Sequence, residues 1–291
     1  MAVTPPEAAT PDAAGQSVGY RVEDGVAIVE LRRPAAGNAL DAALRSGLLA
    51  AVRRVAGASA GDGDGDGDGD GNGEPVRAVL LTAQGRNFCV GQDLKEHAEA
   101  LEHGPAAAFA VVRAEYNPLV EALHALPQPV VVALEGACVG AGLGLALCAD
   151  VRVASQGARF STAFTGIGLA ADSGLSLSLA QAVGPSRAAA LMLLGDRLDA
   201  GDAQLTGLVH RVVPDGQAAA EALALARRLA AGPTAAYGEV KALLREAAAG
   251  AGLSAVLERE AAAQERLGAT DDHRGAVRSF LAKEKPSFEG R

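Results

Sequence analysis

Residues 138–150 read CVGAGLGLALCAD, with glycines at positions 140, 142 and 144. An apolar run typical of a buried strand, PVVVAL (129–134), precedes the stretch, and an apolar helical pattern follows the glycines. Such a turn can cradle a dinucleotide phosphate, present backbone N–H groups to another anion, or only permit close packing. The dinucleotide interpretation is disfavoured, because no acidic residue ends the next strand about 20 residues on.

Strand and helix patterns alternate before and after this stretch. VGYRVEDGVAIVELRRP (18–34) predicts a β-hairpin with its turn at Asp24-Gly25, and NALDAALRSGLLAAVRRVA (38–56) predicts an amphipathic helix. VRAVLLTA (76–83) predicts a buried strand. The last part of the chain predicts helices over 216–231, 233–249, 252–268 and 272–284. This order predicts a parallel α/β core followed by a helical C-terminal region.

The domain organisation follows from composition. We expect a disordered tail over 1–17, a core over 18–215 and a helical region over 216–291. The core contains an insertion, GDGDGDGDGDGNGE (61–74), whose alternating acids suggest calcium. Its register does not fit an EF-hand loop, because counting from Asp62 places Gly73 where the twelfth-position acid belongs. A flexible, self-repelling linker is the simpler interpretation.

Composition excludes several classes of function. The 291 residues carry a net charge of −9, which argues against a nucleic-acid partner. The N-terminus lacks the basic and apolar regions of a signal peptide, and no run of 18 apolar residues predicts a membrane span. Three cysteines without paired spacing suggest a reduced, cytoplasmic protein. The histidines show no metal-ligand spacing, so we expect no metal.

Read together, the segments resemble the crotonase (enoyl-CoA hydratase/isomerase) superfamily. The matching segments lie in order over about residues 18–290: RPAAGNAL (33–40), GRNFCVGQDL (85–94), PQPVVVALEGACVGAGLGLALCADVRVAS (127–155), GLAADSG (168–174), LLGDRLDAGDAQLTGLVHRVVP (193–214) and AVRSFLAKEKPSF (276–288). YNPLV (116–120), DSG (172–174) and the terminal F-x-G-R are most similar to the branch that contains ring-1,2-epoxyphenylacetyl-CoA isomerase. The resemblance implies an α/β fold, a crotonase-like spiral of ββα turns with a C-terminal helical trimerisation region.

The resemblance also implies the chemistry. Members of the superfamily hold the enolate of an acyl-CoA thioester with two backbone N–H groups, which by position would be those of Val90 and Ala141. Coenzyme A is part of the substrate and no other cofactor is implied. The protein would assemble as a homotrimer or as a hexamer built from two trimers.

The resemblance also implies which residues contact the substrate. The substrate-binding residues would be Asn38, Ala39, Leu40, Gln92, Asp93, Leu94, Gly140, Phe164, Phe280, Lys283 and Lys285. The first six would contact adenine and pantetheine, mainly through backbone groups. Phe280 would close the acyl pocket, and the two lysines, together with Arg86, are candidates to meet the phosphates of CoA.

Two glutamates hold water in the hydratases of the superfamily, and their positions here are Gly144 and Phe164. Adding water needs a group that activates it and a group that delivers a proton, whereas moving a double bond needs one proton carrier. Asp172 is the candidate carrier, although it or Ser173 can equally be a helix N-cap.

Other polar residues near these motifs have ordinary structural explanations. Glu96, His97 and Glu115 are weaker candidates for the base, because each fits a solvated helix face. Asp93 and Asp150 fit structural roles, and Cys89 fits a small buried side chain.

Three hypotheses remain open at this point. The first is an acyl-CoA isomerase that uses Asp172, Val90 and Ala141. The second is an enoyl-CoA hydratase with nonstandard catalytic residues. The third is a catalytically silent CoA-binding homologue.

Overall fold

The computed structural model describes residues 16–58 and 75–291. The expected linker at 61–74, and all but the last two residues of the expected tail at 1–17, lie outside the described residues. A six-stranded sheet has the order β1-β2-β3-β4-β6-β9. Its strands are β1 (Val18–Glu23), β2 (Val26–Leu31), β3 (Ala78–Ala83), β4 (Val130–Leu134), β6 (Val151–Ser155) and β9 (Arg211–Val213).

The first two strands form the hairpin that the sequence predicts. They pair antiparallel, and both turn residues, Asp24 (φ 52°) and Gly25 (φ 72°), adopt the positive φ of a tight hairpin turn. Within the six-stranded sheet, every pairing from β2 onward is parallel. Parallel strands need crossover connections, and these carry the helices. The mixed α/β architecture predicted from the alternation is therefore confirmed.

A smaller sheet of three short strands has the order β5-β7-β8. Its strands are β5 (Ala137–Val139), β7 (Arg159–Ser161) and β8 (Leu198–Asp199). β5 begins three residues after β4 ends, so the chain moves from the large sheet to the small one directly before the glycine-rich stretch.

Helices cover both faces of the large sheet. Residues of β3 alternate between the two faces, with Val79 and Leu81 in one apolar cluster and Ala78 and Leu80 in the other. The first cluster also holds apolar residues from α1 (Ala42–Gly57), α4 (Asn117–Ala125), α5 (Ala141–Leu147), α6 (Leu175–Val183), α7 (Pro185–Leu194) and α8 (Ala200–Leu205). The second cluster is closed by α9 (Ala218–Ala230), which packs its small alanines on the strands.

Short helices and turns complete the part of the fold around the site. α2 (Leu94–Leu101) and α3 (Pro105–Val111) precede a π-helical turn, η2 (Val112–Tyr116), that continues into α4. 3-10 turns, η1 (Pro34–Ala36) and η3 (Thr165–Ile167), precede α1 and α6.

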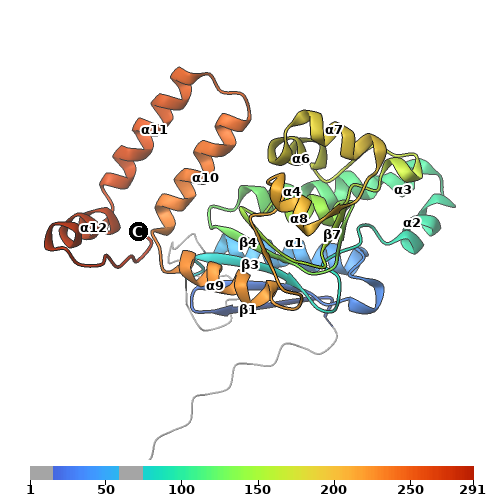
Figure 1. Ribbon diagram of the computed structural model, residues 1–291, viewed down its shortest axis with the longest axis horizontal. Coiled ribbons are helices and arrows are strands. Elements are labelled where there is room, and N and C mark those ends of the chain that lie inside the picture. Colours follow the sequence, from blue (N-terminus) through green and yellow to red (C-terminus); the bar gives the residue numbers. More distant parts are fainter. Residues whose placement is uncertain (1–15, 59–74) are drawn as a thin grey trace, which may run out of the picture.

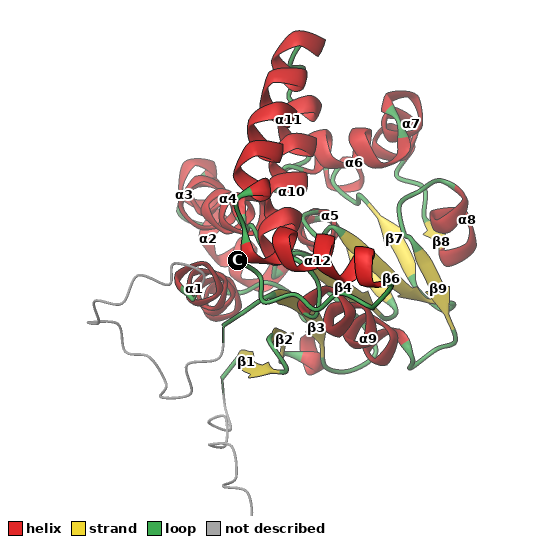
Figure 2. Ribbon diagram, turned by 90° about the vertical axis from the view of Figure 1, so that its left-hand side faces the viewer, coloured by secondary structure: helices red, strands yellow, loops and turns green. Residues whose placement is uncertain are grey.

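The last three helices project from the core as an arm. They are α10 (Thr234–Ala248), α11 (Leu253–Gly268) and α12 (Asp271–Ala282). Figure 1 shows them standing away from the sheet, and Figure 2 shows the molecule from the side of this arm. The four C-terminal helices predicted from the sequence are present, but the first of them, α9, lies on the sheet rather than in the arm. The buried Asp272 secures the end of the chain, because its carboxylate accepts hydrogen bonds from the N–H groups of Glu289 and Gly290.

Candidate active site

The loops that leave β3 and β4 run side by side at one edge of the large sheet. Parallel strands end at the same edge, which is where ligands bind in open α/β sheets. The Phe88 N–H donates to the Glu135 carbonyl oxygen at 2.7 Å, and the Cys89 carbonyl oxygen accepts from the Val139 N–H at 2.9 Å. These backbone bonds fix residues 88–92 against the glycine-rich stretch.

Gly91 allows the loop after β3 to lie close to the start of α5. Its φ is +93°, and a Cβ atom there would lie 3.1 Å from the Val139 carbonyl oxygen and 3.6 Å from the Ala141 nitrogen. A side chain at position 91 would therefore be strained and would separate the two segments. Ala141 begins α5 and is only 3% exposed, and among the described residues its N–H has no acceptor.

The second N–H group of the site belongs to Gln92. The Val90 N–H donates to the Gly37 carbonyl oxygen at 3.2 Å, so it is not available for a ligand. This contradicts the expectation that Val90 supplies a donor. The Gln92 N–H has no acceptor among the described residues, and it follows the glycine that touches Ala141. The local sequence predicts the loop, but it does not show which backbone N–H groups of the loop already donate to a carbonyl oxygen.

The peptide between Gly91 and Gln92 is oriented by Leu40. The Leu40 N–H donates to the Gly91 carbonyl oxygen at 2.8 Å, and the Leu40 carbonyl oxygen accepts from the Asp93 N–H at 3.3 Å. In a trans peptide the C=O and the next N–H point in opposite directions. Because the Gly91 carbonyl points at Leu40, the Gln92 N–H points away from it.

The segment expected to bind CoA, residues 38–40, is buried and holds this loop. Asn38 donates its side-chain amide to the Gln84 and Asn87 carbonyl oxygens at 2.9 and 2.8 Å. The Ala39 carbonyl oxygen accepts from Arg33 at 2.9 Å. The structure therefore brings these residues beside the loop, with several of their polar groups already paired internally.

Asp93 and Leu94 begin α2. Asp93 is its N-cap, and its carboxylate accepts from the Lys95 and Glu96 N–H groups at 2.9 and 3.3 Å. It also accepts from Arg33 at 2.6 Å. The structural role predicted for Asp93 matches these contacts. The Leu94 side chain is exposed, with 64% of its surface accessible.

Gly144 lies one turn after the start of α5 and touches the loop that carries Asp172. A Cβ atom at position 144 would lie 2.8 Å from the Ser173 Cβ and 2.9 Å from the Ser173 carbonyl oxygen. No side chain fits there unless the loop moves. The position at which a hydratase carries its first glutamate is thus filled by the residue next to Asp172.

The Asp172 carboxylate is half-buried and is not used as a helix cap. α6 begins after Gly174 and has no side-chain cap. The carboxylate instead accepts from the Ser173 hydroxyl at 2.8 Å. Burial raises the pKa of Asp172, and the hydrogen bond from Ser173 opposes that shift only in part. A carboxyl with a raised pKa is suited to take up and return protons.

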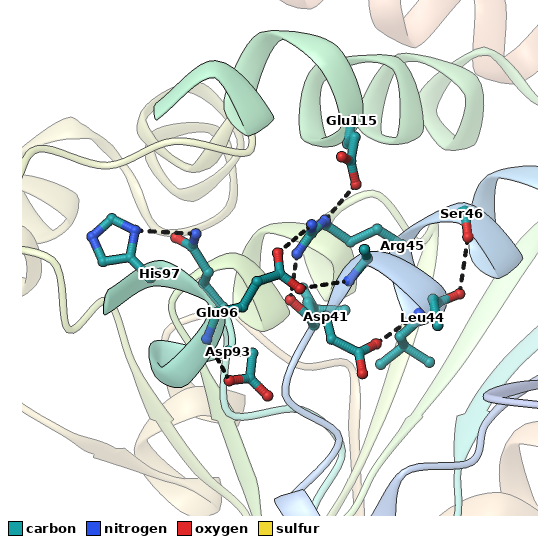
Figure 3. A network of polar contacts seen from close by, with 12 residues as sticks. Asp41, Leu44, Arg45, Ser46, Asp93, Glu96, His97 and Glu115 are labelled. Carbon is teal, nitrogen blue, oxygen red and sulfur yellow. Dashed lines mark hydrogen bonds and ion pairs between the residues drawn. The ribbon is translucent and has the colours of Figure 1, made fainter. Parts of the chain in front are cut away.

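The other acidic candidates gather around a buried arginine instead. Arg45 donates to Glu96 at 2.6 Å and to Glu115 at 2.7 Å (Figure 3). His97 lies against the Phe109 ring, with 5.3 Å between ring centroids. Glu96 and Glu115 are thus ion-paired rather than fully solvated.

Gly140 and Phe164 lie near the end of β7. The Gly140 N–H donates to the Ser161 carbonyl oxygen at 3.0 Å, which holds the end of β7 beside the start of α5. Three residues later, the half-buried Phe164 packs against the larger apolar cluster. The second glutamate position of a hydratase is therefore an aromatic side chain close to the same segment.

Phe280, Lys283 and Lys285 do not reach this site within their own chain. Phe280 is 80% exposed on α12, and both lysines are exposed beyond it. Figure 1 shows α12 at the opposite end of the molecule from α2, α3, α6 and α7. A contact of these residues with the substrate would therefore need a neighbouring copy of the chain, and it stays a prediction.

Several remaining groups have structural explanations. Asp150 accepts from the Val130 N–H and from Lys241, at 2.7 and 2.6 Å. Burial raises the pKa of Cys89 to about 12, so its thiol stays protonated. No three His, Cys, Asp or Glu side chains in residues 16–58 and 75–291 form a group that could hold a metal. None of the helices described for this chain is long and apolar enough to cross a bilayer.

The sequence implies no role for two buried side chains near the site. Arg45 is 2% exposed and lies 5.3 Å from the Tyr116 ring centroid. The Tyr116 hydroxyl is buried and has no hydrogen-bond partner in the described part of the chain. The burial of Arg45 could have been predicted, because this arginine lies on the apolar face of the predicted helix over 38–56.

The chain is similar to proteins of one family over most of its length. The family model described as enoyl-CoA hydratase/isomerase matches residues 21–291. A Rhodobacter capsulatus protein named "Probable enoyl-CoA hydratase" is 39% identical over 94% of this chain and 98% of its own length. The 1,2-epoxyphenylacetyl-CoA isomerase of Escherichia coli is 35% identical over 93% of this chain and 97% of its own.

A solved structure from Mycobacterium abscessus that bears the name enoyl-CoA hydratase/isomerase is similar over nearly the whole fold. It is 56% identical, has a TM-score of 0.86, and the match covers 94% of this chain and 100% of that one.

Proposed function

The chain belongs to the enoyl-CoA hydratase/isomerase family, and we propose that within it this protein is an acyl-CoA isomerase. One observation carries the proposal. The loop that holds Asp172, a half-buried carboxyl with a raised pKa that caps no helix, fills the space beside Gly144 where a hydratase has a glutamate. The site thus has one proton carrier beside two unpaired backbone donors.

The N–H groups of Ala141 and Gln92 bind the thioester oxygen in this proposal. They come from two segments that Gly91 brings together, and fixed donors of this kind stabilise charge that develops on oxygen. Ala141 is buried, which keeps water away from one donor and strengthens its interaction with an anion.

Asp172 moves the proton. On a 3-enoyl-CoA, the carboxylate takes the proton from C2, and the electrons of that C–H bond move into the thioester to give a dienolate. The oxyanion is held by the two N–H groups. Returning the same proton to C4 yields the 2-enoyl-CoA and restores the carboxylate. The name of the E. coli relative extends the substrate class to ring epoxides of aryl-acetyl-CoA.

Hydration is the second candidate, favoured by the name of the 39% identical relative. It needs a second group to activate water, and positions 144 and 164 supply only glycine and phenylalanine. A third outcome, binding of acyl-CoA without reaction, fits a silent homologue.

We infer that the arm forms a subunit interface, in a homotrimer or a hexamer of two trimers as the family resemblance implies. Its helices expose large apolar side chains that a single chain leaves uncovered: Val240, Leu244, Leu253, Leu257, Phe280 and Leu281. Exposed apolar surface of this extent is typical of a subunit interface. In such an assembly Phe280, Lys283 and Lys285 would meet the acyl-CoA bound to a neighbouring copy.

The test offers the purified protein a 3-enoyl-CoA and crotonyl-CoA in D2O, and follows product and deuterium at C2 and C4. Isomerisation and exchange that are lost in Asp172→Asn, and kept in Asp199→Asn, support the proposal. Asp199 is a matched carboxylate that caps α8, a role asparagine also fills. Rapid hydration of crotonyl-CoA without isomerisation would replace the proposal with the second candidate.

A further inference from the structure

Arg45 is a buried charge that the proposed chemistry does not use. It lies on α1, between Leu44 and Ser46, and is the largest of the fully buried side chains among the described residues. Burying a guanidinium is costly unless its N–H groups are bonded and its charge is paired. Its partners therefore show what this arginine holds.

Three bonds from Arg45 reach three parts of the chain. Its Nη2 donates to Glu96 of α2 at 2.6 Å, and its Nε donates to Glu115 of η2 at 2.7 Å. Its Nη1 donates to the carbonyl oxygen of Leu40 at 2.7 Å. Figure 3 shows the two carboxylates converging on the guanidinium from separate helices. The planar fork of an arginine suits such divergent acceptors, and a lysine cannot reproduce it.

Glu96 also fixes the start of α1. Its second oxygen accepts from the Ala42 N–H at 2.8 Å, so one carboxylate joins the beginning of α1 to the arginine one turn later. The side chains of Glu96 and Glu115 are 35% and 40% exposed, whereas that of Arg45 is 1% exposed. The carboxylates thus hold the guanidinium from the solvent side and direct its remaining bond inward, at Leu40.

Leu40 transmits this restraint to the site. Its carbonyl oxygen is shared between Arg45 and the Asp93 N–H, and its own N–H binds the Gly91 carbonyl oxygen. These bonds form the Leu40–Gln92 bridge, which sets the rotation of the peptide that ends in the Gln92 N–H. A shift of Leu40 would rotate that N–H relative to the Ala141 N–H.

We propose that Arg45 is a positioning residue of the oxyanion site, which holds the Leu40–Gln92 bridge and so aims the Gln92 N–H. This inference rests on the proposed function, because it assigns that N–H to the thioester oxygen. Arg45 itself touches no substrate, and Glu96 and Glu115 act by holding its guanidinium.

The test compares Arg45→Met with Arg152→Met. Arg152 is the matched control: it is also buried, and it also donates to backbone carbonyls, those of Leu208 and Ala149 at 2.6 and 2.7 Å. It lies near the start of β6, at the other edge of the sheet from the loops of the site. Both substitutions remove a buried guanidinium, so both lower stability, but only one loosens the bridge.

Two readouts separate positioning from stability. In Arg45→Met, kcat for isomerisation is expected to fall by about 30- to 300-fold, because the donor is misaligned rather than removed, while KM changes little. The infrared C=O frequency of a bound acyl-CoA is expected to shift toward that of the free thioester, because the oxygen is less polarised. Arg152→Met is expected to leave kcat per folded enzyme and the C=O frequency as in the unaltered protein.

Milder variants keep the inference testable if Arg45→Met does not fold. Glu115→Gln leaves the guanidinium in place but weakens one restraint, and is expected to lower kcat by about threefold to tenfold with a smaller frequency shift. Arg45→Lys is expected to recover only part of the activity. Unchanged kcat and C=O frequency in the Arg45 and Glu115 variants, alongside an active unaltered protein, would overturn the inference and leave the proposed function intact. An unaltered protein that neither turns over nor polarises an acyl-CoA would overturn both.

Discussion

Gly144 on α5 and Ser173 in the loop before α6 are packed against each other so closely that a Cβ atom at position 144 would come within 2.8 Å of the Ser173 Cβ. The missing side chain at position 144 therefore leaves no cavity, because Ser173 occupies the space. The same contact places Asp172 beside the first turn of α5, so the one candidate proton carrier stands on a loop rather than on the helix.

Restoring a glutamate at position 144 is not expected to create a hydratase. The side chain would displace Ser173, and such overpacking typically costs about 1–3 kcal/mol of unfolding free energy. Gly144→Glu should therefore unfold at lower denaturant concentration and lose isomerisation as well. Gly57→Glu is the control, because a Cβ at position 57 meets nothing within 4 Å. Efficient hydration by Gly144→Glu with unchanged stability would contradict this prediction.

Asp172→Asn is expected to reduce isomerisation by about 100- to 10,000-fold, the range typical of a lost general base, with little change in acyl-CoA binding. In the unaltered protein the pKa of Asp172 is raised by burial, so kcat/KM should rise with pH until this carboxyl is ionised. A pH–rate profile with no acidic limb would remove Asp172 from the mechanism.

The same raised pKa has an effect on stability whose sign is opposite to that of a salt-bridged carboxylate. In the unfolded chain Asp172 ionises at its ordinary pKa, and in the folded protein it ionises at a higher pH. The folded protein therefore loses stability as the pH rises from the first value to the second, and the deficit remains at neutral pH. Asp172→Asn should raise the unfolding free energy at pH 7 but not at a pH where the carboxyl is protonated in both states. Chemical denaturation at the two pH values measures the difference.

Replacing single backbone amides by esters tests which N–H groups bind the oxyanion. An ester between residues 91 and 92 removes the Gln92 N–H and is expected to lower kcat by about 100- to 1,000-fold. An ester that removes the Val90 N–H is the control, because that group donates to the Gly37 carbonyl oxygen. It should reduce stability slightly and leave kcat largely unchanged. A larger loss of kcat in the Val90 ester than in the Gln92 ester would instead assign the oxyanion donor to the Val90 N–H.

Mixed oligomers test the contribution of the arm. If Lys283 and Lys285 serve the site of a neighbouring copy, Lys283→Glu/Lys285→Glu subunits and Asp172→Asn subunits should each be weakly active alone. Reassembled together, they should recover activity, because some sites then combine an intact Asp172 with intact lysines. Light scattering verifies the assembly, and no recovery in verified mixed trimers would place the lysines outside the site.

The helices and turns of this fold can be predicted where residues close in the sequence determine them. The Asp24-Gly25 turn and the four C-terminal helices follow from residues a few positions apart. The donor at Gln92 could not be predicted, because its direction depends on a bridge to Leu40, about fifty positions earlier in the chain. The location of Phe280 could not be predicted for a similar reason: the sequence predicts its helix but not the direction of the arm.

The two groups proposed to hold the enolate are main-chain amides, brought together by Gly91 and the start of α5. A side-chain substitution cannot delete an amide proton unless it introduces proline. Side chains around the site, the acidic residue included, can therefore change during evolution while the two N–H groups proposed to hold the enolate remain in place.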